Sequence, residues 1–335
     1  MDIERLVQRA EIVRKIRAFF TGRGYLELDT PALSPDLIPE TCLEVFETVW
    51  YDPHGNTQPL YLAPSPEIYL KPIIAKYKIP VFQVSKCYRN YESSGHIHSP
   101  EFTMLEYYTM NADYRDSIAV TEDLFRALDV PSGMQPPFIR LTLDDAFAEY
   151  AGFRLSEAQT PAALAEQARN LGIAESAASP FDRWPWDDLY ELILVHAVEP
   201  SLPRDTPTLL MDYPAQVPCL AKDAPAPGRG RPVCWKERWE LYCDGMELAN
   251  CYTEETDPWK VKAYFEREGE LKAQTARIPH GVTEDYWKLF RGFPDCSGVA
   301  LGVDRLAALM CGAASIEGVL PFPLSAPSLP SRAPA

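Results

Sequence analysis

Residues 80–108, PVFQVSKCYRNYESSGHIHSPEFTMLEYY, carry the pattern that most restricts the fold. Residues 81–87 are apolar and β-branched, and residues 101–108 alternate acids with aromatic and apolar side chains, which predicts two strands joined by a loop. A guanidinium at a strand end, here Arg89, can grip a phosphate with paired donors. Phe102 follows a proline by two positions and could stack on a base. The hairpin is therefore predicted to form one wall of a nucleotide site.

Further hairpins and a late strand place this pair in a larger sheet. Strands are predicted at 44–51, 59–63, 208–212, 216–220, 235–243, 246–252 and 297–303, and helices at 3–20, 66–77, 113–130, 142–151, 257–277, 283–291 and 304–312. Asp244-Gly245 is a hairpin turn signal. Because strands dominate 26–108 and 208–252, we expect an α+β fold in which helices flank an antiparallel β-sheet, not a doubly wound parallel sheet.

Composition excludes several classes of protein. The 335 residues are 46% hydrophobic and 24% charged, which is typical of a soluble globular chain. The net charge of −16 argues against broad binding to a polyphosphate backbone. Eight cysteines without a C-x-x-C pair indicate reduced thiols in a cytoplasmic protein. No apolar run approaches ~20 residues, so no membrane partner is expected. Neither of two common glycine-rich nucleotide-binding motifs, G-x-x-x-x-G-K-S/T and G-x-G-x-x-G, is present.

Two further stretches combine charge with strand context. Glu240 and Glu247 flank a tight turn, so both can face one site as oxygen ligands for Mg²⁺ bridging ATP phosphates. A solvated acidic hairpin is the alternative. Arg305 begins a helix directly after the strand GVALGV, whose glycines allow close approach of a ligand, although an ordinary strand-to-helix turn has the same pattern. His96 and His98 could suggest a metal, but at a spacing of two in a loop, a plain loop or phosphate contact is favoured.

Together these stretches resemble the three motifs of class II aminoacyl-tRNA synthetases. GYLELDTPALSP (24–35) resembles motif 1, YRN…SPEFTMLE motif 2 and GVALGVDRL motif 3. APSPE (63–67), HSPEFTMLEYY (98–108) and MELANCYTEETD (246–257) are similar to the lysyl branch. That branch carries an N-terminal anticodon-binding β-barrel, for which a pattern starting at residue 4 leaves no room. The chain thus resembles the elongation factor P–(R)-β-lysine ligase family, which PDCSGVALGVDRL (294–306) matches closely.

The resemblance implies an organisation and a chemistry. It implies a single catalytic domain over 1–320 with a mostly helical insertion at about 112–235, a Pro-rich tail at 321–335 and no anticodon-binding domain. The implied activity is ATP-dependent, AMP-forming ligation of (R)-β-lysine or lysine to a lysine side chain of elongation factor P. ATP and Mg²⁺ are the implied cofactors, motif 1 implies a homodimer, and tRNA is an unlikely partner. A stand-alone lysyl-tRNA synthetase-like enzyme acting on tRNA or another acceptor, and an inactive regulatory paralogue, stay open as alternatives.

Site roles follow position by position from the same resemblance. Arg89 and Arg305 are the implied catalytic residues, and Glu240 and Glu247 the implied Mg²⁺ ligands. The implied ATP site comprises Arg89, Asn90, Glu92, Ser99, Phe102, Glu247, Leu248, Gly302 and Arg305. The implied amino-acid site comprises Ser65, Pro66, Glu67, Tyr108, Asn250, Glu254 and Ala300. Tyr108 and Glu254 should hold the distal ammonium, and Ala300 stands where lysyl synthetases have glycine.

The sequence departs from the family pattern in two places. Motif 2 usually reads Arg-Asn-Glu, whereas this chain has Arg89-Asn90-Tyr91-Glu92, so the loop is one residue longer and Glu92 is expected to take the glutamate role. Cys251 stands where the family tends to have glycine, which affects the expected floor of the pocket.

Overall fold

The computed structural model describes residues 2–91, 96–224 and 234–324. Within these ranges a mixed eight-stranded sheet forms the centre of the molecule. Its strands, in spatial order, are β1 (Leu26–Glu27), β5 (Val81–Tyr88), β6 (Glu101–Met110), β11 (Cys296–Gly302), β10 (Met246–Thr253), β9 (Trp235–Cys243), β8 (Thr208–Pro214) and β7 (Ile139–Thr142). Among the described strands of this sheet, only the two edge pairs, β1–β5 and β7–β8, are parallel. The predicted α+β class, an antiparallel sheet flanked by helices, is confirmed.

Local turn chemistry explains the β9–β10 hairpin. Asp244 and Gly245 have φ values of 49° and 72°, a left-handed pair that matches the twist of a two-residue hairpin. The pairing then shifts register between Glu247 and Ala249, so one extra residue, Leu248, interrupts the ladder. This bulge places Asn250 opposite Glu240, on the same face of the sheet.

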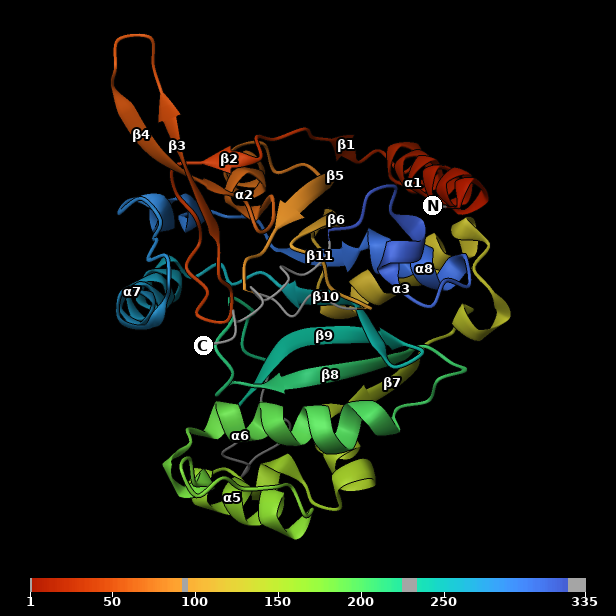
Figure 1. The fold of residues 1–335 in the computed structure, drawn as a ribbon, viewed down its shortest axis with the longest axis vertical. Coiled ribbons are helices and arrows are strands. Elements are labelled where there is room, and N and C mark those ends of the chain that lie inside the picture. The colour runs from red at the N-terminus through yellow and green to blue at the C-terminus, as the bar shows by residue number, and fades with distance from the viewer. Residues whose placement is uncertain (1, 92–95, 225–233, 325–335) are drawn as a thin grey trace, which may run out of the picture.

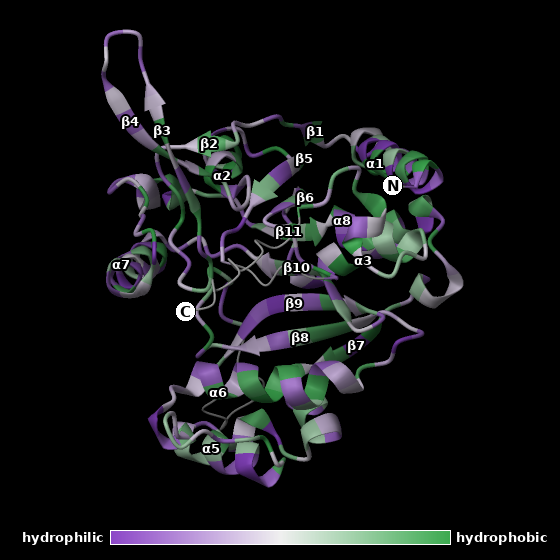
Figure 2. Ribbon diagram, viewed as in Figure 1, coloured by the Kyte–Doolittle hydropathy of each residue, from purple (hydrophilic) through white to green (hydrophobic). Residues whose placement is uncertain are grey.

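The main hydrophobic core lies on the other face of the sheet. Alternate residues of the central strands enter it, including Leu105, Tyr107, Trp239, Leu241 and Leu301, each fully or almost fully buried. Helices α1 (Ile3–Gly22), α3 (Tyr114–Leu128) and α8 (Val303–Met310) cover this face (Figure 1). Figure 2 shows hydrophobic segments on α3, α8 and β8 in the interior of the molecule.

Smaller layers surround the sheet. The three-stranded sheet of β2 (Leu33–Ser34), β4 (Thr57–Leu62) and β3 (Phe46–Tyr51) carries a hairpin that projects from the body (Figure 1). Helices α2 (Glu67–Tyr77) and α7 (Pro258–Thr275) share a second core that includes Ile74, Val261 and Phe290. Helices α4 (Leu143–Ala146), α5 (Pro161–Asn170) and α6 (Trp186–Ile193) form a third core with β8. Trp186 packs in this third core, where its ring stacks on Tyr190 with centroids 5.4 Å apart.

Two sequence predictions need correction. No strand forms at 216–220; the chain turns there, with the Val217 amide donating to Pro214, because Pro214 and Pro218 cannot donate to a ladder. Residues 283–291 hold a short 3₁₀ helix, Tyr286–Phe290, in place of an α-helix. Most of the Pro-rich tail predicted at 321–335 lies outside the described residues. Among the helices that the structure describes, none has the length and apolarity needed to span a membrane.

Candidate active site

A cavity of about 800 Å³ opens on the face of the sheet opposite the main core. Period-2 alternation places one set of side chains from four neighbouring strands along it. These are Phe102, Met104, Glu106 and Tyr108 of β6, Gly298, Ala300 and Gly302 of β11, Asn250 and Tyr252 of β10, and Arg238, Glu240 and Tyr242 of β9. The cavity therefore follows from strand alternation together with the bulge at Leu248.

The central strand β11 gives the cavity its depth. Its cavity-facing positions are Gly298, Ala300 and Gly302, which add almost no side-chain volume. At Gly298 a Cβ atom would lie 2.6 Å from Tyr108 Cε1 and 2.8 Å from Glu254 Oε1, so those two side chains lie directly over the glycine. Small residues on the middle strand thus leave room for a ligand between β6 and β10.

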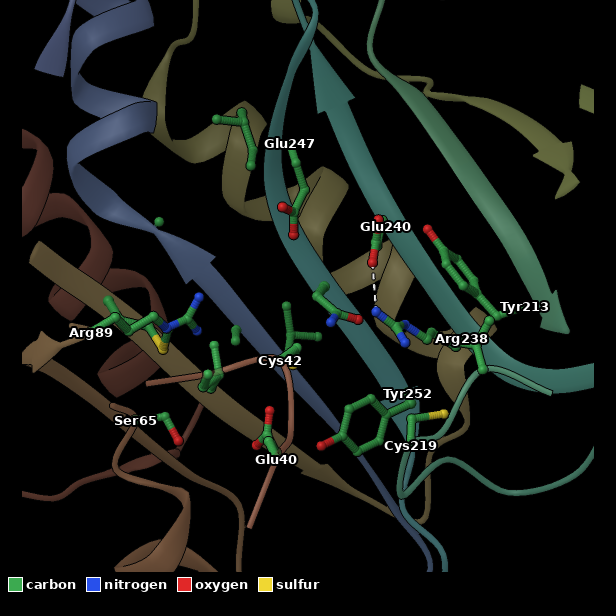
Figure 3. Close-up of a pocket in the computed structure, with 18 of the residues that line it drawn as sticks. Glu40, Cys42, Ser65, Arg89, Tyr213, Cys219, Arg238, Glu240, Glu247 and Tyr252 are labelled. Carbon is green, nitrogen blue, oxygen red and sulfur yellow. Dashed lines mark hydrogen bonds and ion pairs between the residues drawn. The ribbon is translucent and has the colours of Figure 1, made fainter. Parts of the chain in front are cut away.

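Arginines line one end of the cavity. The guanidinium carbon of Arg89 lies 5.2 Å from the ring centroid of Phe102, and Figure 3 shows Arg89 directed into the cavity. Arg305 donates from Nε to the Ile97 carbonyl (3.1 Å) and from Nη1 to the Glu247 carbonyl (2.7 Å). Arg305 thus connects the loop after β5 to β10, and its charge faces the same space as Arg89. Paired guanidinium groups of this kind suit a polyphosphate.

One buried carboxylate joins helix α1 to the segments that resemble motifs 2 and 3. Asp304, only 2% exposed, accepts from the Thr103 amide (2.6 Å) and from Arg9 Nη2 (2.6 Å). Arg9 lies on α1, Thr103 on β6 and Asp304 on α8. This contact holds the helix of Arg305 against the strand of Phe102.

Glu240 and Glu247 face the cavity from adjacent strands (Figure 3). Glu240 accepts from Arg238 Nη2 (2.6 Å) and from the Tyr242 hydroxyl (2.8 Å). Burial, followed by the charge of Glu240, raises the pKa of Glu247, so this pair carries negative charge that a cation would stabilise.

These donors fit a magnesium ion shared with a phosphate. Mg²⁺ in nucleotide sites is bound by one or two carboxylates and completed by phosphate oxygens and water. No cluster of three or more metal-ligating side chains occurs in the part of the chain that the structure describes, so the His96–His98 pair does not belong to one there. The donor set therefore suits an ion brought with its phosphates and does not suit a closed protein site.

Carboxylates line the opposite end of the cavity. Glu67 begins α2, Glu106 lies on β6 and Glu254 follows β10, and each is less than a tenth exposed. The Tyr108 hydroxyl donates to Glu106 Oε2 (3.1 Å). Behind them Lys71 of α2 is fully buried and forms ion pairs with Glu67 and with Glu254 Oε2, the latter at 2.9 Å.

The ionisation of this end reflects an excess of carboxylates. Burial, and then the charge of Glu67, raises the pKa of Glu106 to about 8 and that of Glu40 to about 7. Burial also raises the pKa of Glu254 to about 7, although Lys71 acts in the opposite direction. Burial alone would lower the pKa of Lys71, but Glu254 and Glu67 raise it. Cationic groups entering this end would be stabilised.

The structure brings most of the predicted site residues to this one cavity. Its lining includes Ser65, Glu67, Arg89, Ser99, Phe102, Tyr108, Glu240, Glu247, Leu248, Asn250, Glu254, Ala300, Gly302 and Arg305. Pro66 and Asn90 lie outside the lining: Pro66 precedes the first turn of α2, and the Asn90 side chain donates to the Val45 carbonyl (3.2 Å). Glu92 lies outside the described residues. The roles assigned to these residues stay predictions.

Sequence reasoning missed several groups at the site. Glu106 shares the cavity face with Tyr108 by strand alternation, and Arg238 shares it with Glu240, so the period of two could have found both. Lys71 follows Glu67 by one helical turn, a spacing that favours an ion pair. The acidic side of α6, with Asp187, Asp188 and Glu191 on the cavity, had no signal in the sequence.

Comparison with known protein families agrees with this geometry. Residues 3–326 match the family of class II tRNA synthetases for D, K and N. The chain belongs to this family. Class II synthetases activate amino acids for ligation and in general use ATP and Mg²⁺. The arginines, the acidic pair and the buried carboxylates described above therefore lie in a catalytic domain of the class II synthetase type.

Proposed function

We propose that this protein is an ATP-dependent, AMP-forming ligase that activates (R)-β-lysine or lysine and transfers it to a lysine side chain of elongation factor P. The observation that carries the proposal is the cluster of three buried carboxyl groups at the amino-acid end, Glu67, Glu106 and Glu254, against the single ammonium of Lys71. An amino acid with two ammonium groups would bring the missing positive charge.

The charge of the cavity also orients the two substrates. Arg89 and Arg305 would bind the ATP phosphates, and Phe102 would stack on adenine. The carboxylates at the far end would bind the ammonium groups of the amino acid. Its own carboxylate would then point away from that end, toward the α-phosphate. Positioning of this kind lowers the barrier without a dedicated acid or base.

In the first step, an oxygen of the amino-acid carboxylate forms a bond to the α-phosphorus, and the bond from this phosphorus to the bridging oxygen of pyrophosphate breaks. Arg89 stabilises the negative charge that develops on the α-phosphate oxygens. Glu240 and Glu247 would hold Mg²⁺, which neutralises charge on the phosphates. The products are an aminoacyl-adenylate and pyrophosphate.

In the second step, the neutral ε-amine of the acceptor lysine attacks the carbonyl carbon of the adenylate. A C–N bond forms, the bond from this carbon to the AMP oxygen breaks, and the proton lost by the amine passes to solvent. The products are AMP and an amide on the acceptor.

Ala300 is proposed to influence which lysine isomer is activated. In the ladder Ala300 pairs with Glu106 on one side and with Asn250 on the other, so its methyl group lies on the floor of the amino-acid end. Discrimination by one methyl group is worth roughly 1–3 kcal/mol. We expect Ala300→Gly to relax selectivity between (R)-β-lysine and α-lysine by about tenfold, measured as the ratio of kcat/KM values.

The test is ATP–pyrophosphate exchange with (R)-β-lysine, α-lysine and neutral amino acids, followed by mass measurement of elongation factor P after incubation. Exchange with a diamino acid and a matching mass increase would support the proposal. Exchange followed by charging of tRNA alone would favour a stand-alone synthetase, and absence of exchange with every amino acid would favour an inactive paralogue.

We further propose a homodimer through the motif 1 segment. Ile3 and Val7 of α1 are 70% and 62% exposed, and Leu26 of β1 is 47% exposed. Ile3 and Val7 lie one helical turn apart, and exposed apolar side chains of this kind suit an interface. Light scattering of the wild type and of Val7→Glu should give a dimer and a weakened dimer, respectively. A monomeric wild type would exclude this assembly.

A further inference from the structure

The side chain of Lys71 is completely buried, and a gain in folding stability does not explain why a lysine is buried there. Its side chain is 0% exposed, and its ammonium lies 5.8 Å from the ring centroids of both Tyr252 and Phe290. Taking an ammonium out of water costs several kcal/mol, and well-packed apolar residues often serve stability as well as a buried ion pair does. A buried lysine at this place therefore points to a role other than stability.

The partners of Lys71 are side chains of the cavity. Glu67 and Glu254 both line the cavity, whereas Lys71 lies behind them and does not. Glu67 is on α2 and Glu254 follows β10, so this ammonium is the contact that joins the two carboxylates across separate elements. Without it, two buried carboxylates would repel each other, and one would move or take up a proton.

The Glu254 carboxylate is also confined by strand β11. A Cβ atom added to Gly298 would lie 2.8 Å from Glu254 Oε1, while Glu254 Oε2 pairs with Lys71. Strand β11 on one side and the Lys71 ammonium on the other thus fix the orientation of this carboxylate. Fixed orientation matters because a carboxylate that is already held in place loses little entropy when it binds an ammonium group.

We propose that Lys71 is a positioning residue for amino-acid selection, which holds Glu67 and Glu254 in place so that they bind the ammonium groups of a diamino acid. This inference rests on the proposed function for the identity of the ligand. Lys71 contacts no substrate atom itself; it acts through the two carboxylates.

The ion pairs of Lys71 with Glu67 and Glu254 predict how Lys71 variants should bind the diamino acid. In Lys71→Met the ammonium is lost and the volume is largely kept, so we expect the Kd for the diamino acid to rise at least tenfold. Affinity for ATP should stay within twofold of wild type. Lys71→Arg keeps the charge but presents a planar fork in place of a compact ammonium, so it should fold and give an intermediate rise in Kd.

Isothermal titration with lysine, (R)-β-lysine and the neutral isostere norleucine measures these constants directly. Glu122→Gln is the matched control, because Glu122 is a buried carboxylate 7% exposed that accepts from the Phe138 amide, away from the cavity. It should lower thermal stability without changing the Kd. Loss of discrimination between diamino acids and norleucine in both Lys71 variants would support the inference.

Two outcomes would overturn it. One is a folded Lys71 variant with a wild-type Kd and a lowered melting temperature, which indicates a structural role alone. The other is a wild type that binds neither diamino acid. Pyrophosphate exchange, run in parallel, separates the two proposals, since binding without exchange refutes the ligase function and leaves the role of Lys71 intact.

Discussion

The substitution Gly298→Ala tests how closely the floor of the cavity supports the amino-acid end. The added Cβ would lie 2.6 Å from Tyr108 Cε1 and 2.8 Å from Glu254 Oε1. Favourable contacts between carbon atoms are at about 3.5–4.0 Å, so the Tyr108 ring must move by roughly 1 Å. Because that ring is buried against the second core, it can move only toward the cavity. Overpacking of this kind costs about 1–3 kcal/mol of the free energy of unfolding.

The same movement should weaken amino-acid binding. Displacing Tyr108 breaks its hydrogen bond to Glu106 Oε2 and crowds Glu254. Loss of one hydrogen bond costs about 0.5–1.5 kcal/mol, which corresponds to a rise of about 2- to 10-fold in the KM of the amino acid. The KM of ATP should not change. Pyrophosphate exchange at varied concentrations of each substrate measures both values.

Gly269 provides the matched control. It lies in α7, and no atom is found within 4 Å of a Cβ built there. Gly269→Ala should therefore stabilise the protein by about 0.5–1 kcal/mol through helix propensity and leave both KM values unchanged. If Gly298→Ala kept the wild-type KM for the amino acid, the assignment of Tyr108 and Glu254 to the amino-acid site would be refuted.

Three further predictions concern the acidic and basic side chains of the site. Because the pKa of Glu106 is about 8 in the folded chain against 4.5 for a free glutamate, the folded state binds the extra proton, and stability decreases as the pH rises from about 5 to 8. Glu106→Gln should remove this pH dependence. In urea unfolding, the free energy of unfolding of the variant relative to wild type should therefore be higher at pH 8 than at pH 5.5. An equal difference between variant and wild type at both pH values would contradict the prediction. Arg305→Ala should reduce kcat/KM for ATP about 100-fold in pyrophosphate exchange. Arg305→Lys should recover little of this activity, because a single ammonium cannot replace the two directed contacts of the guanidinium with Ile97 and Glu247. Full activity of the lysine variant would refute the need for a guanidinium at this position. Asp304→Asn should lose about 3 kcal/mol in urea unfolding through its buried pair with Arg9, and a loss below about 1 kcal/mol would show that this contact is dispensable.

Local sequence signals predicted the strands of the site well. The β9–β10 hairpin was readable because Asp244 and Gly245 can both adopt positive φ, and the alternation of 101–108 indicated which residues share a face. The prediction of a strand at 216–220 was wrong because apolar composition was given more weight than the prolines around it. The parallel pairing of β1 with β5 depends on contacts far apart in sequence, which local patterns do not encode.

The charge state of the site could not be predicted in the same way. Glu67 and Lys71 at a spacing of four are typical of an exposed helix surface, and only the packing of α2 in the second core buries them. The bulge at Leu248 likewise has no local signal, yet it determines that Asn250 faces the cavity opposite Glu240. Sequence therefore indicated the kinds of residues at the site, and tertiary packing determined their protonation and their partners.

The distribution of charge along the cavity explains more than the net charge of the chain. A formal charge of −16 suggests repulsion of any polyphosphate, yet Arg89 and Arg305 create a local region that can accept ATP. At the other end, buried carboxylates select for cations, with Lys71 offsetting only part of their charge. A nucleotide and a cationic amino acid are thus drawn to opposite ends, and the reacting carboxylate and α-phosphate meet between them. Replacing the charged side chains at either end of the cavity with neutral ones should therefore weaken catalysis more than the loss of one binding contact would. The reason is that the second substrate also loses its orientation toward the first.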